Sequence, residues 1–159
     1  MGESYAMMPL YTVSLFGHRH IENTVEAQFK LEKTISAILS KYEYTDFLVG
    51  RNGDFDILAA SVIKRTKGAL DAANASLILV LPYVTAEYRH NQDLLLAYYN
   101  DVEIFNHAGH YKSAIVRRNH YMIDRSDAVI GCVSHPCGGA YQAIQYAKKR
   151  GKTVINLSE

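Results

Sequence analysis

The sequence predicts an α/β domain: a three-layer, Rossmann-like fold with a mainly parallel sheet of five or six strands. Short and almost purely apolar runs recur along the chain, as is typical of parallel strands that are covered on both faces. Amphipathic stretches with helical spacing separate these runs, and alternating strands and helices favour right-handed crossovers within one sheet. With 159 residues, 48% of them hydrophobic, the chain can bury a core without a disulfide or a metal.

Apolar runs mark the expected strands, which cover residues 11–16, 47–49, 76–81, 102–105, 128–133 and 153–157. The run at 102–105 is the weakest of them. We expect residues 10–159 to form a single domain, preceded by a flexible N-terminal segment at residues 1–9. That segment has Glu3 where a signal peptide would be basic, and two cysteines do not make a disulfide framework. We therefore expect a cytoplasmic protein without a membrane span.

Helical spacing predicts five helices between the strands. Asn23 and Glu26 form a capping-box pattern, after which an apolar face is expected at Val25, Phe29, Ile35, Ile38 and Leu39. Asp54 is expected to cap the second helix, with its apolar stripe at Leu58, Ala59, Val62, Ile63 and Leu70. Residues 85–99, 111–123 and 140–150 are the other expected helices. Gly151 should end the last of them, and three basic residues complement its dipole.

Polar, glycine-bearing segments follow several of these strands. Residues 17–20, 50–56 and 134–139 come directly after the first, second and fifth strand, and Pro82 follows the third. Ligands of an open parallel sheet bind outside the carboxyl ends of its strands. Glycine lets backbone N–H groups approach a phosphate, and the start of the following helix adds partial positive charge. The pattern therefore predicts a site for a nucleotide-like ligand at this edge.

Each candidate residue is assigned to a part of that ligand. Phosphate is expected at Gly17, Arg19, Arg118, Gly138 and Gly139, and ribose or base at Asn52, Asp54 and Asp56. The full set of expected ligand-binding residues is Gly17, His18, Arg19, Gly50, Asn52, Gly53, Asp54, Asp56, Pro82, Arg118, Asn119, Gly138, Gly139 and Ala140. An equally open interpretation is that the glycines serve only turns that need a positive φ.

Other residue types give weaker signals. Cys132, His135 and Cys137 have no evident fourth ligand, so we expect no metal, and no cofactor is implied. The tyrosines at 83, 88, 98, 99, 111 and 121 are expected mostly in the core, although one or two could stack on a base. Walker and GxGxxG fingerprints are both missing from the sequence.

Three segments in order resemble the SLOG superfamily, specifically its YpsA-like branch. They are residues 13–19, residues 49–56, and residues 118–130 running on to Gly138 and Gly139. The resemblance covers nearly the whole chain and implies a Rossmann-like fold with nucleotide ligands at its strand ends. It also implies related activities: the LOG-type phosphoribohydrolases are enzymes, other members sense ADP-ribose-like signals, and DNA-processing protein A binds single-stranded DNA.

The enzyme branch of the family has a glutamate that this chain lacks. Arg118 and Asn119 are similar to its M-x-x-R-K segment, and the paired glycines at 138 and 139 are similar to its P-G-G-x-G-T-x-x-E segment. Gln145 stands at the glutamate position, and an amide cannot act as a general acid or base. If the chain is an enzyme, Asp54, Asp56 and Arg118 are the expected catalytic residues.

These observations lead us to expect a protein that senses or sequesters an ADP-ribose-like compound or a mononucleotide. The alternative is an N-glycosidic hydrolase of the phosphoribohydrolase kind that acts on nucleotides. Single-stranded DNA binding is the least expected function. The sequence pI of 7.8 and the net charge of +1 are low for a nucleic-acid-binding domain, so a nucleic-acid partner is unlikely. We also expect a homo-oligomer, with Tyr88, Tyr98 and Tyr99 as candidates for its interface.

Overall fold

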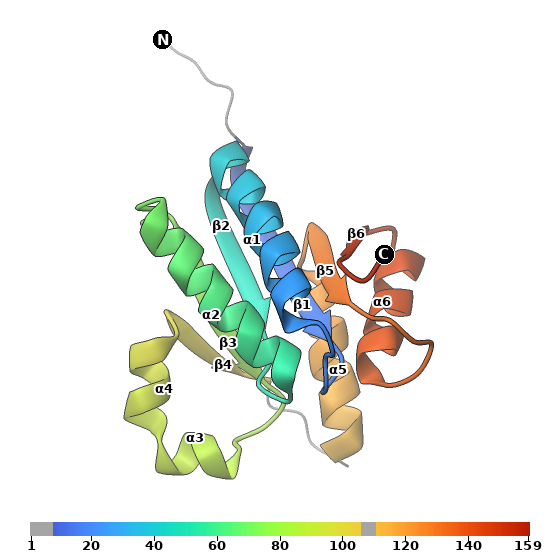
Figure 1. Ribbon diagram of the computed structural model, residues 1–159. Coiled ribbons are helices and arrows are strands. Elements are labelled where there is room, and N and C mark those ends of the chain that lie inside the picture. Colours follow the sequence, from blue (N-terminus) through green and yellow to red (C-terminus); the bar gives the residue numbers. More distant parts are fainter. Residues whose placement is uncertain (1–7, 106–110) are drawn as a thin grey trace.

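The protein is a six-stranded, entirely parallel sheet with helices on both faces, as seen in a computed structural model that describes residues 8–105 and 111–159 (Figure 1). The strand order is β4-β3-β2-β1-β5-β6. The strands are β1 (Met8–Gly17), β2 (Tyr42–Val49), β3 (Ala75–Leu81), β4 (Asp101–Ile104), β5 (Ala128–Cys132) and β6 (Thr153–Asn156). The predicted fold class and all six predicted strands are therefore confirmed.

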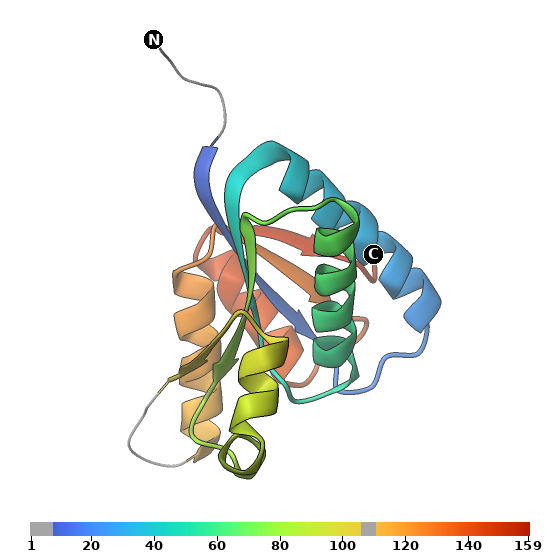
Figure 2. The same ribbon diagram turned by 90° about the vertical axis from the view of Figure 1, so that its left-hand side faces the viewer.

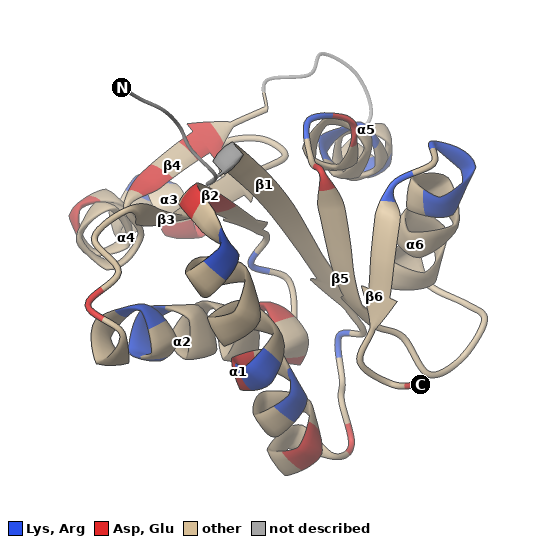
Figure 3. Cartoon of the chain, turned by 90° about the horizontal axis from the view of Figure 1, so that it is seen from above, with Lys and Arg blue, Asp and Glu red and all other residues tan. Residues whose placement is uncertain are grey.

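The helices form the two outer layers of the fold. They are α1 (Thr24–Lys41), α2 (Asp54–Ala69), α3 (Ala86–His90), α4 (Gln92–Tyr98), α5 (Tyr111–Asp124) and α6 (Gly139–Lys149). Figure 3 shows α1 and α2 on one side of the sheet and α5 and α6 on the other. In Figure 2, α3 and α4 lie beside β3 and β4, at the edge of the sheet. No helix in the described part of the chain is long and apolar enough to cross a membrane.

Two buried clusters hold these layers together. The larger lies between the sheet and α1 and α2, where Leu31, Ile35, Phe55 and Ile63 are fully buried. The smaller lies under α5 and α6 and includes Met122, Ile123 and Ile144. Burying a leucine, isoleucine or phenylalanine side chain contributes about 1.5–3 kcal/mol, so the two faces together position the strand ends firmly.

The N-terminal half of α1 differs from its expected orientation. Asn23 does cap the helix, because its side chain accepts a hydrogen bond from the backbone N–H of Glu26 (3.1 Å). However, Val25 is 79% exposed and Phe29 is 60% exposed. Ala27 and Leu31 take their place against the sheet, so the expected apolar face is wrong over its first two turns.

Two further helix boundaries also differ. The N-cap of α2 is Gly53, whose backbone is extended, and Asp54 is the first helical residue, so the predicted cap at Asp54 is wrong. The single helix expected at 85–99 is divided at Asn91 into α3 and α4. The last helix ends as predicted, with Gly151 at a φ of +74°.

The expected N-terminal segment lies mostly outside the described residues, which begin at Met8. Met8 and Pro9, which we placed in that segment, are the first residues of β1. Met8 is in register with Tyr42, so β1 and β2 extend together beyond the apolar runs that predicted them.

Candidate functional site

The carboxyl ends of the parallel strands bring most of the predicted loops together. Between β1 and β5 the strand order reverses, since β5 follows β4 in the chain but pairs with β1 (Figure 1). A cavity of about 200 Å³ lies at this edge. It is lined by Phe16, Gly17, Arg19, Asn52, Gly53, Asp56, Ile115, Arg118, Asn119, Gly139 and Ala140. Nine of these were predicted from the sequence, and we call this space the carboxyl-edge cavity.

Arg118 is the most unusual residue of the carboxyl-edge cavity. It extends from α5 with only 3% of its surface exposed. Its Nη1 donates to the carbonyl of Val80 (2.7 Å) and its Nε donates to Oδ1 of Asn119 (2.9 Å). Within the described residues, no carboxylate forms an ion pair with it at 4.0 Å or less. Burial lowers its pKa, yet an arginine side chain remains protonated.

Asp56 is the acidic residue whose charge favours the protonated form of Arg118. Its Oδ2 accepts a hydrogen bond from the backbone N–H of Asn52 (2.8 Å). Burial raises the pKa of its carboxyl group, while that hydrogen bond and the Arg118 guanidinium act in the opposite direction. An added Cβ at Gly50 would lie 3.1 Å from Oδ2 of Asp56 and 3.2 Å from Nη1 of Arg118. Gly50 therefore lies where the two charged groups approach, although it does not line the cavity.

Two of the predicted glycines are explained by packing. A Cβ at Gly17 would lie 2.2 Å from the ring of Phe55, and one at Gly53 would lie 2.5 Å from the Cα of Arg19. The first and second loops are also joined by the backbone, because the N–H of Asp54 donates to the carbonyl of Arg19 (2.7 Å). These glycines allow the end of β1 and the loop after it to approach the start of α2 closely.

The start of α6 closes the cavity on its third side. Gly138 is the N-cap and has a φ of +92°, and Gly139 and Ala140 of the first turn line the cavity. No side chain caps the helix, and its first turn contains no acidic residue. The backbone N–H groups and the positive end of the dipole at this terminus are suited to an anion.

Three other predicted residues lie elsewhere. Asp54 is exposed at the start of α2, with its Oδ2 3.6 Å from Nδ1 of His20. Pro82 is buried at the end of β3 and does not line the cavity. His18 faces a separate cavity of about 300 Å³, which is also lined by His20 and Cys132.

His18 holds the loop after β5. Its Nε2 accepts hydrogen bonds from the backbone N–H groups of Ser134 (3.1 Å) and His135 (3.4 Å). Its ring also stacks on that of His135, with centroids 3.6 Å apart. Burial lowers the pKa of His18, with a further contribution from His135, which agrees with a neutral, accepting imidazole. An accepting Nε2 cannot donate to a phosphate.

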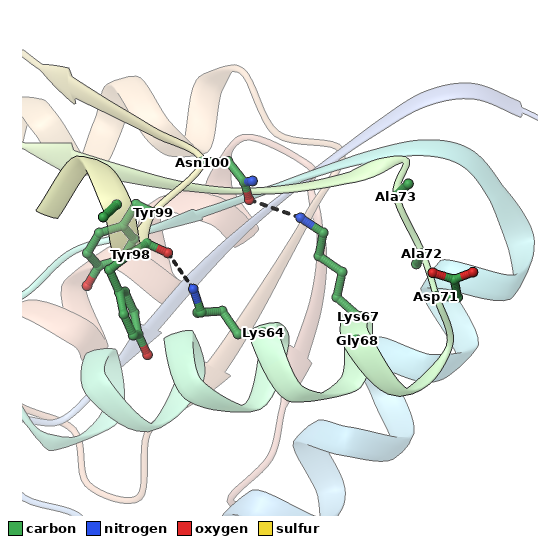
Figure 4. A pocket seen from close by; sticks show the side chains of 10 residues that line it. Lys64, Lys67, Gly68, Asp71, Ala72, Ala73, Tyr98, Tyr99 and Asn100 are labelled. Atoms are coloured by element: carbon green, nitrogen blue, oxygen red, sulfur yellow. Dashed lines mark hydrogen bonds between the residues drawn. The ribbon is translucent and has the colours of Figure 1, made fainter. Parts of the chain in front are cut away.

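A larger cavity of about 310 Å³ lies at the amino edge of the sheet, between the end of α2 and the turn before β4 (Figure 4). Lys64 donates to the carbonyl of Tyr98 (2.7 Å), and Lys67 donates to Oδ1 of Asn100 (3.1 Å). The C-terminal end of a helix disfavours an anion, and Asp71 adds a negative charge. These lysines join α2 to the α4–β4 turn, so we do not consider this cavity the nucleotide site.

Sequence reasoning missed some of the residues around the carboxyl-edge cavity. Ile115 lines it, and the three-residue spacing from Ile115 to Arg118 was the available signal, because such residues share a helix face.

Tyr99 was expected at an interface but is only 2% exposed, and its hydroxyl accepts a hydrogen bond from Nη1 of Arg51 (2.9 Å). Within the described residues, no group of three or more histidine, cysteine or acidic side chains is arranged to hold a metal.

Comparison with known proteins gives a likeness in fold. No protein-family model matches the chain, and no curated protein matches its sequence. The X-ray structure of DNA processing protein A from Streptococcus pneumoniae matches 91% of this chain with a TM-score of 0.64 and 15% identity. DNA processing protein A from Helicobacter pylori, whose structure concerns its single-stranded DNA binding mode, matches with the same three values. The chain spans 49% and 63% of the length of these two chains.

These neighbours confirm the Rossmann-like fold but give no support to the YpsA-like branch. They also correct one prediction. We expected a small nucleotide-like ligand as the partner and a nucleic acid to be unlikely, whereas the neighbour from Helicobacter pylori binds single-stranded DNA. The prediction relied on the pI and net charge of the whole chain, and these values carry no information on single side chains such as Arg118, which is buried in α5.

Proposed function

We propose that this chain binds single-stranded DNA at the carboxyl edge of its sheet, with a backbone phosphate in the carboxyl-edge cavity. The observation that carries the proposal is Arg118, a buried guanidinium that lines a cavity and has no carboxylate in ion-pair contact within the described residues. A buried charge without such a partner is costly, and a phosphate oxygen would compensate it. The fold likeness to DNA processing protein A supports DNA as the source of that phosphate.

The surroundings of Arg118 support the same assignment. The first turn of α6 has no side-chain cap and lines the cavity, and the backbone N–H groups of a helix start are suited to a phosphate. Arg19 is exposed at the mouth, where a second phosphate of the strand would pass. Asp56 opposes an anion when it is ionised, but burial raises the pKa of its carboxyl group and so weakens this opposition.

The hydrolase alternative has less support. Gln145, at the position of the family's glutamate, lines a different cavity with His135 and Lys148, so the amide is not at the carboxyl-edge cavity. The YpsA-like resemblance and an ADP-ribose ligand rest on the sequence motifs alone.

The test is the fluorescence anisotropy of a labelled oligothymidine titrated with the wild-type chain and with Arg118→Gln. Hydrogen bonds to charged groups contribute about 1.5–3 kcal/mol, so we expect affinity to fall about 10- to 100-fold. Arg117→Gln is the matched control, because Arg117 precedes Arg118 on α5, is exposed and does not line the cavity. It makes the same change in net charge and should have little effect.

A second variant guards against a misfolded Arg118→Gln. Ala140→Asp adds a carboxylate to the first turn of α6, where it should stabilise the helix by about 0.3–1 kcal/mol but repel a phosphate. We expect a raised melting temperature together with weakened DNA binding. Unlabelled ADP-ribose and AMP serve as competitors. A chain that binds these compounds but not the oligothymidine, or one on which Arg118→Gln and Ala140→Asp have no effect, would overturn the proposal.

A further inference from the structure

We propose that Tyr83 and Tyr111 form a base-stacking subsite beside the carboxyl-edge cavity, an inference that rests on the proposed function and extends it. The two residues come from separate segments. Tyr83 follows β3 by two residues and Tyr111 is the first residue of α5. Their ring centroids are 5.7 Å apart and their planes are tilted by 56°. Both belong to the carboxyl edge, because Tyr83 comes just after β3 and Tyr111 begins α5, the helix that follows β4 and returns along the sheet.

The tyrosine pair is contiguous with the phosphate site. Tyr111, Ile115 and Arg118 are spaced four and three residues apart on α5, which places them along one face of the helix. Ile115 and Arg118 line the cavity, so the face that begins at Tyr111 leads directly into it. Tyr83 lies near enough to the Arg118 guanidinium to act on its pKa, which it raises. A strand with a phosphate at Arg118 would therefore place a neighbouring base close to these rings.

Tyr111 has the exposure that such a platform needs. It is 62% exposed although it packs against Tyr83. Of the other exposed tyrosines, Tyr98 has Nζ of Lys64 4.2 Å from its ring centroid, and the hydroxyl of Tyr121 accepts a hydrogen bond from Nη1 of Arg125. Tyr44 is 53% exposed but belongs to β2 near its amino end, away from the cavity.

The chemistry of stacking fits single strands rather than duplexes. Every base has a π-face that an aromatic ring can contact, whereas a paired base in a duplex is already stacked on its neighbours. The contact with Tyr83 helps to hold the exposed Tyr111 ring in place for a base. We therefore expect binding that depends on the presence of bases but only weakly on their sequence.

The experiment compares an oligothymidine with an abasic oligonucleotide of the same length and phosphate count, by fluorescence anisotropy. The wild-type chain should bind the abasic strand about 5- to 100-fold more weakly, the range expected for one stacked base. Tyr111→Ala should weaken binding to the oligothymidine by a similar factor and leave binding to the abasic strand unchanged. Tyr111→Phe keeps the ring and should bind as the wild type does, and so should the control Tyr44→Ala.

The outcomes separate the two proposals. If the wild type binds both oligonucleotides equally well, or if Tyr111→Ala binds the oligothymidine as tightly as the wild type, the stacking subsite is wrong while DNA binding stands. If the wild type binds neither oligonucleotide, the proposed function itself fails and the subsite fails with it.

Discussion

Asp56 and Arg118 approach each other at Gly50, so opposite charges lie close together where Arg118 is almost fully buried. Burial acts against the charged form of both, raising the pKa of the Asp56 carboxyl group and lowering that of the Arg118 guanidinium. Because the arginine stays protonated, the aspartate is the group that changes charge as the pH falls. The charge of the carboxyl-edge cavity should therefore depend on pH through this one residue.

We predict that Asp56→Asn strengthens DNA binding at neutral pH. An asparagine carbonyl can still accept the hydrogen bond from the Asn52 backbone, while a negative charge is removed from the cavity. The expected gain is about fivefold, or roughly 1 kcal/mol. Anisotropy titrations as the pH is lowered from neutrality should show the wild type gaining affinity relative to the variant, because its own carboxyl group becomes protonated. A variant that binds more weakly at every pH would contradict this role.

The raised pKa of the Asp56 carboxyl group also makes the stability of the fold depend on pH. A carboxyl pKa that is raised in the folded state favours the protonated form, so the stabilisation from Asp56 is present in acid and is lost as the pH rises through that pKa. Asp56→Asn should therefore compare more favourably with the wild type at neutral pH than in acid. Thermal unfolding at the two pH values measures this difference.

At the level of elements, the loop after β1 and the start of α2 depend on each other through Gly17 and Phe55. The Phe55 ring is fully buried and occupies the space that a Cβ of Gly17 would need. Neither glycine 17 nor glycine 53 has a positive φ, so both serve close packing rather than a left-handed turn. The position of the first two loops relative to the cavity thus depends on contacts between segments far apart in sequence.

We predict that Gly17→Ala destabilises the protein by about 1–3 kcal/mol, the usual cost of overpacking a core. Gly68→Ala is the matched control, because Gly68 lies within α2 and an added Cβ there meets nothing within 4 Å. Alanine is the better helix former by roughly 1 kcal/mol, so this control should raise stability. Urea unfolding measures both changes. Equal effects of the two substitutions would refute the packing role of Gly17.

Strands and helix boundaries differ in how well the sequence predicts them. Apolar runs locate all six strands, because a strand covered on both faces must be apolar. They miss the first half of β2, since Glu43 and Asp46 interrupt the run there while pairing with β1 continues. The apolar spacing also fails to predict the break at Asn91 and the exposure of Phe29.

For the whole molecule, the loops after β1 and β2 and the helices α5 and α6 meet at one cavity because parallel strands all end at the same edge. Nine of the residues that this rule selected line one shared space. The rule does not predict the direction of a side chain. It therefore also selected His18 and Asp54, which face elsewhere. Side-chain direction depends on partners such as Ser134 and His20, which are known only once the chain is folded.

The net charge of +1 over 159 residues leads to the last prediction, on the salt dependence of DNA binding. A protein that covers a strand with a basic surface neutralises many phosphates, and each contributes about −0.7 to the slope of log K against log salt for single strands. Here Arg118 and Arg19 account for at most two phosphates at the cavity, so we expect a shallow slope of roughly −1.4. Arg118→Gln should reduce its magnitude by about 0.7, because one phosphate contact is lost. A steep slope that Arg118→Gln leaves unchanged would mean that the strand binds another surface. Anisotropy titrations over a series of potassium chloride concentrations measure this slope. Stacking on Tyr111 adds affinity that salt does not screen, so it leaves the slope unchanged.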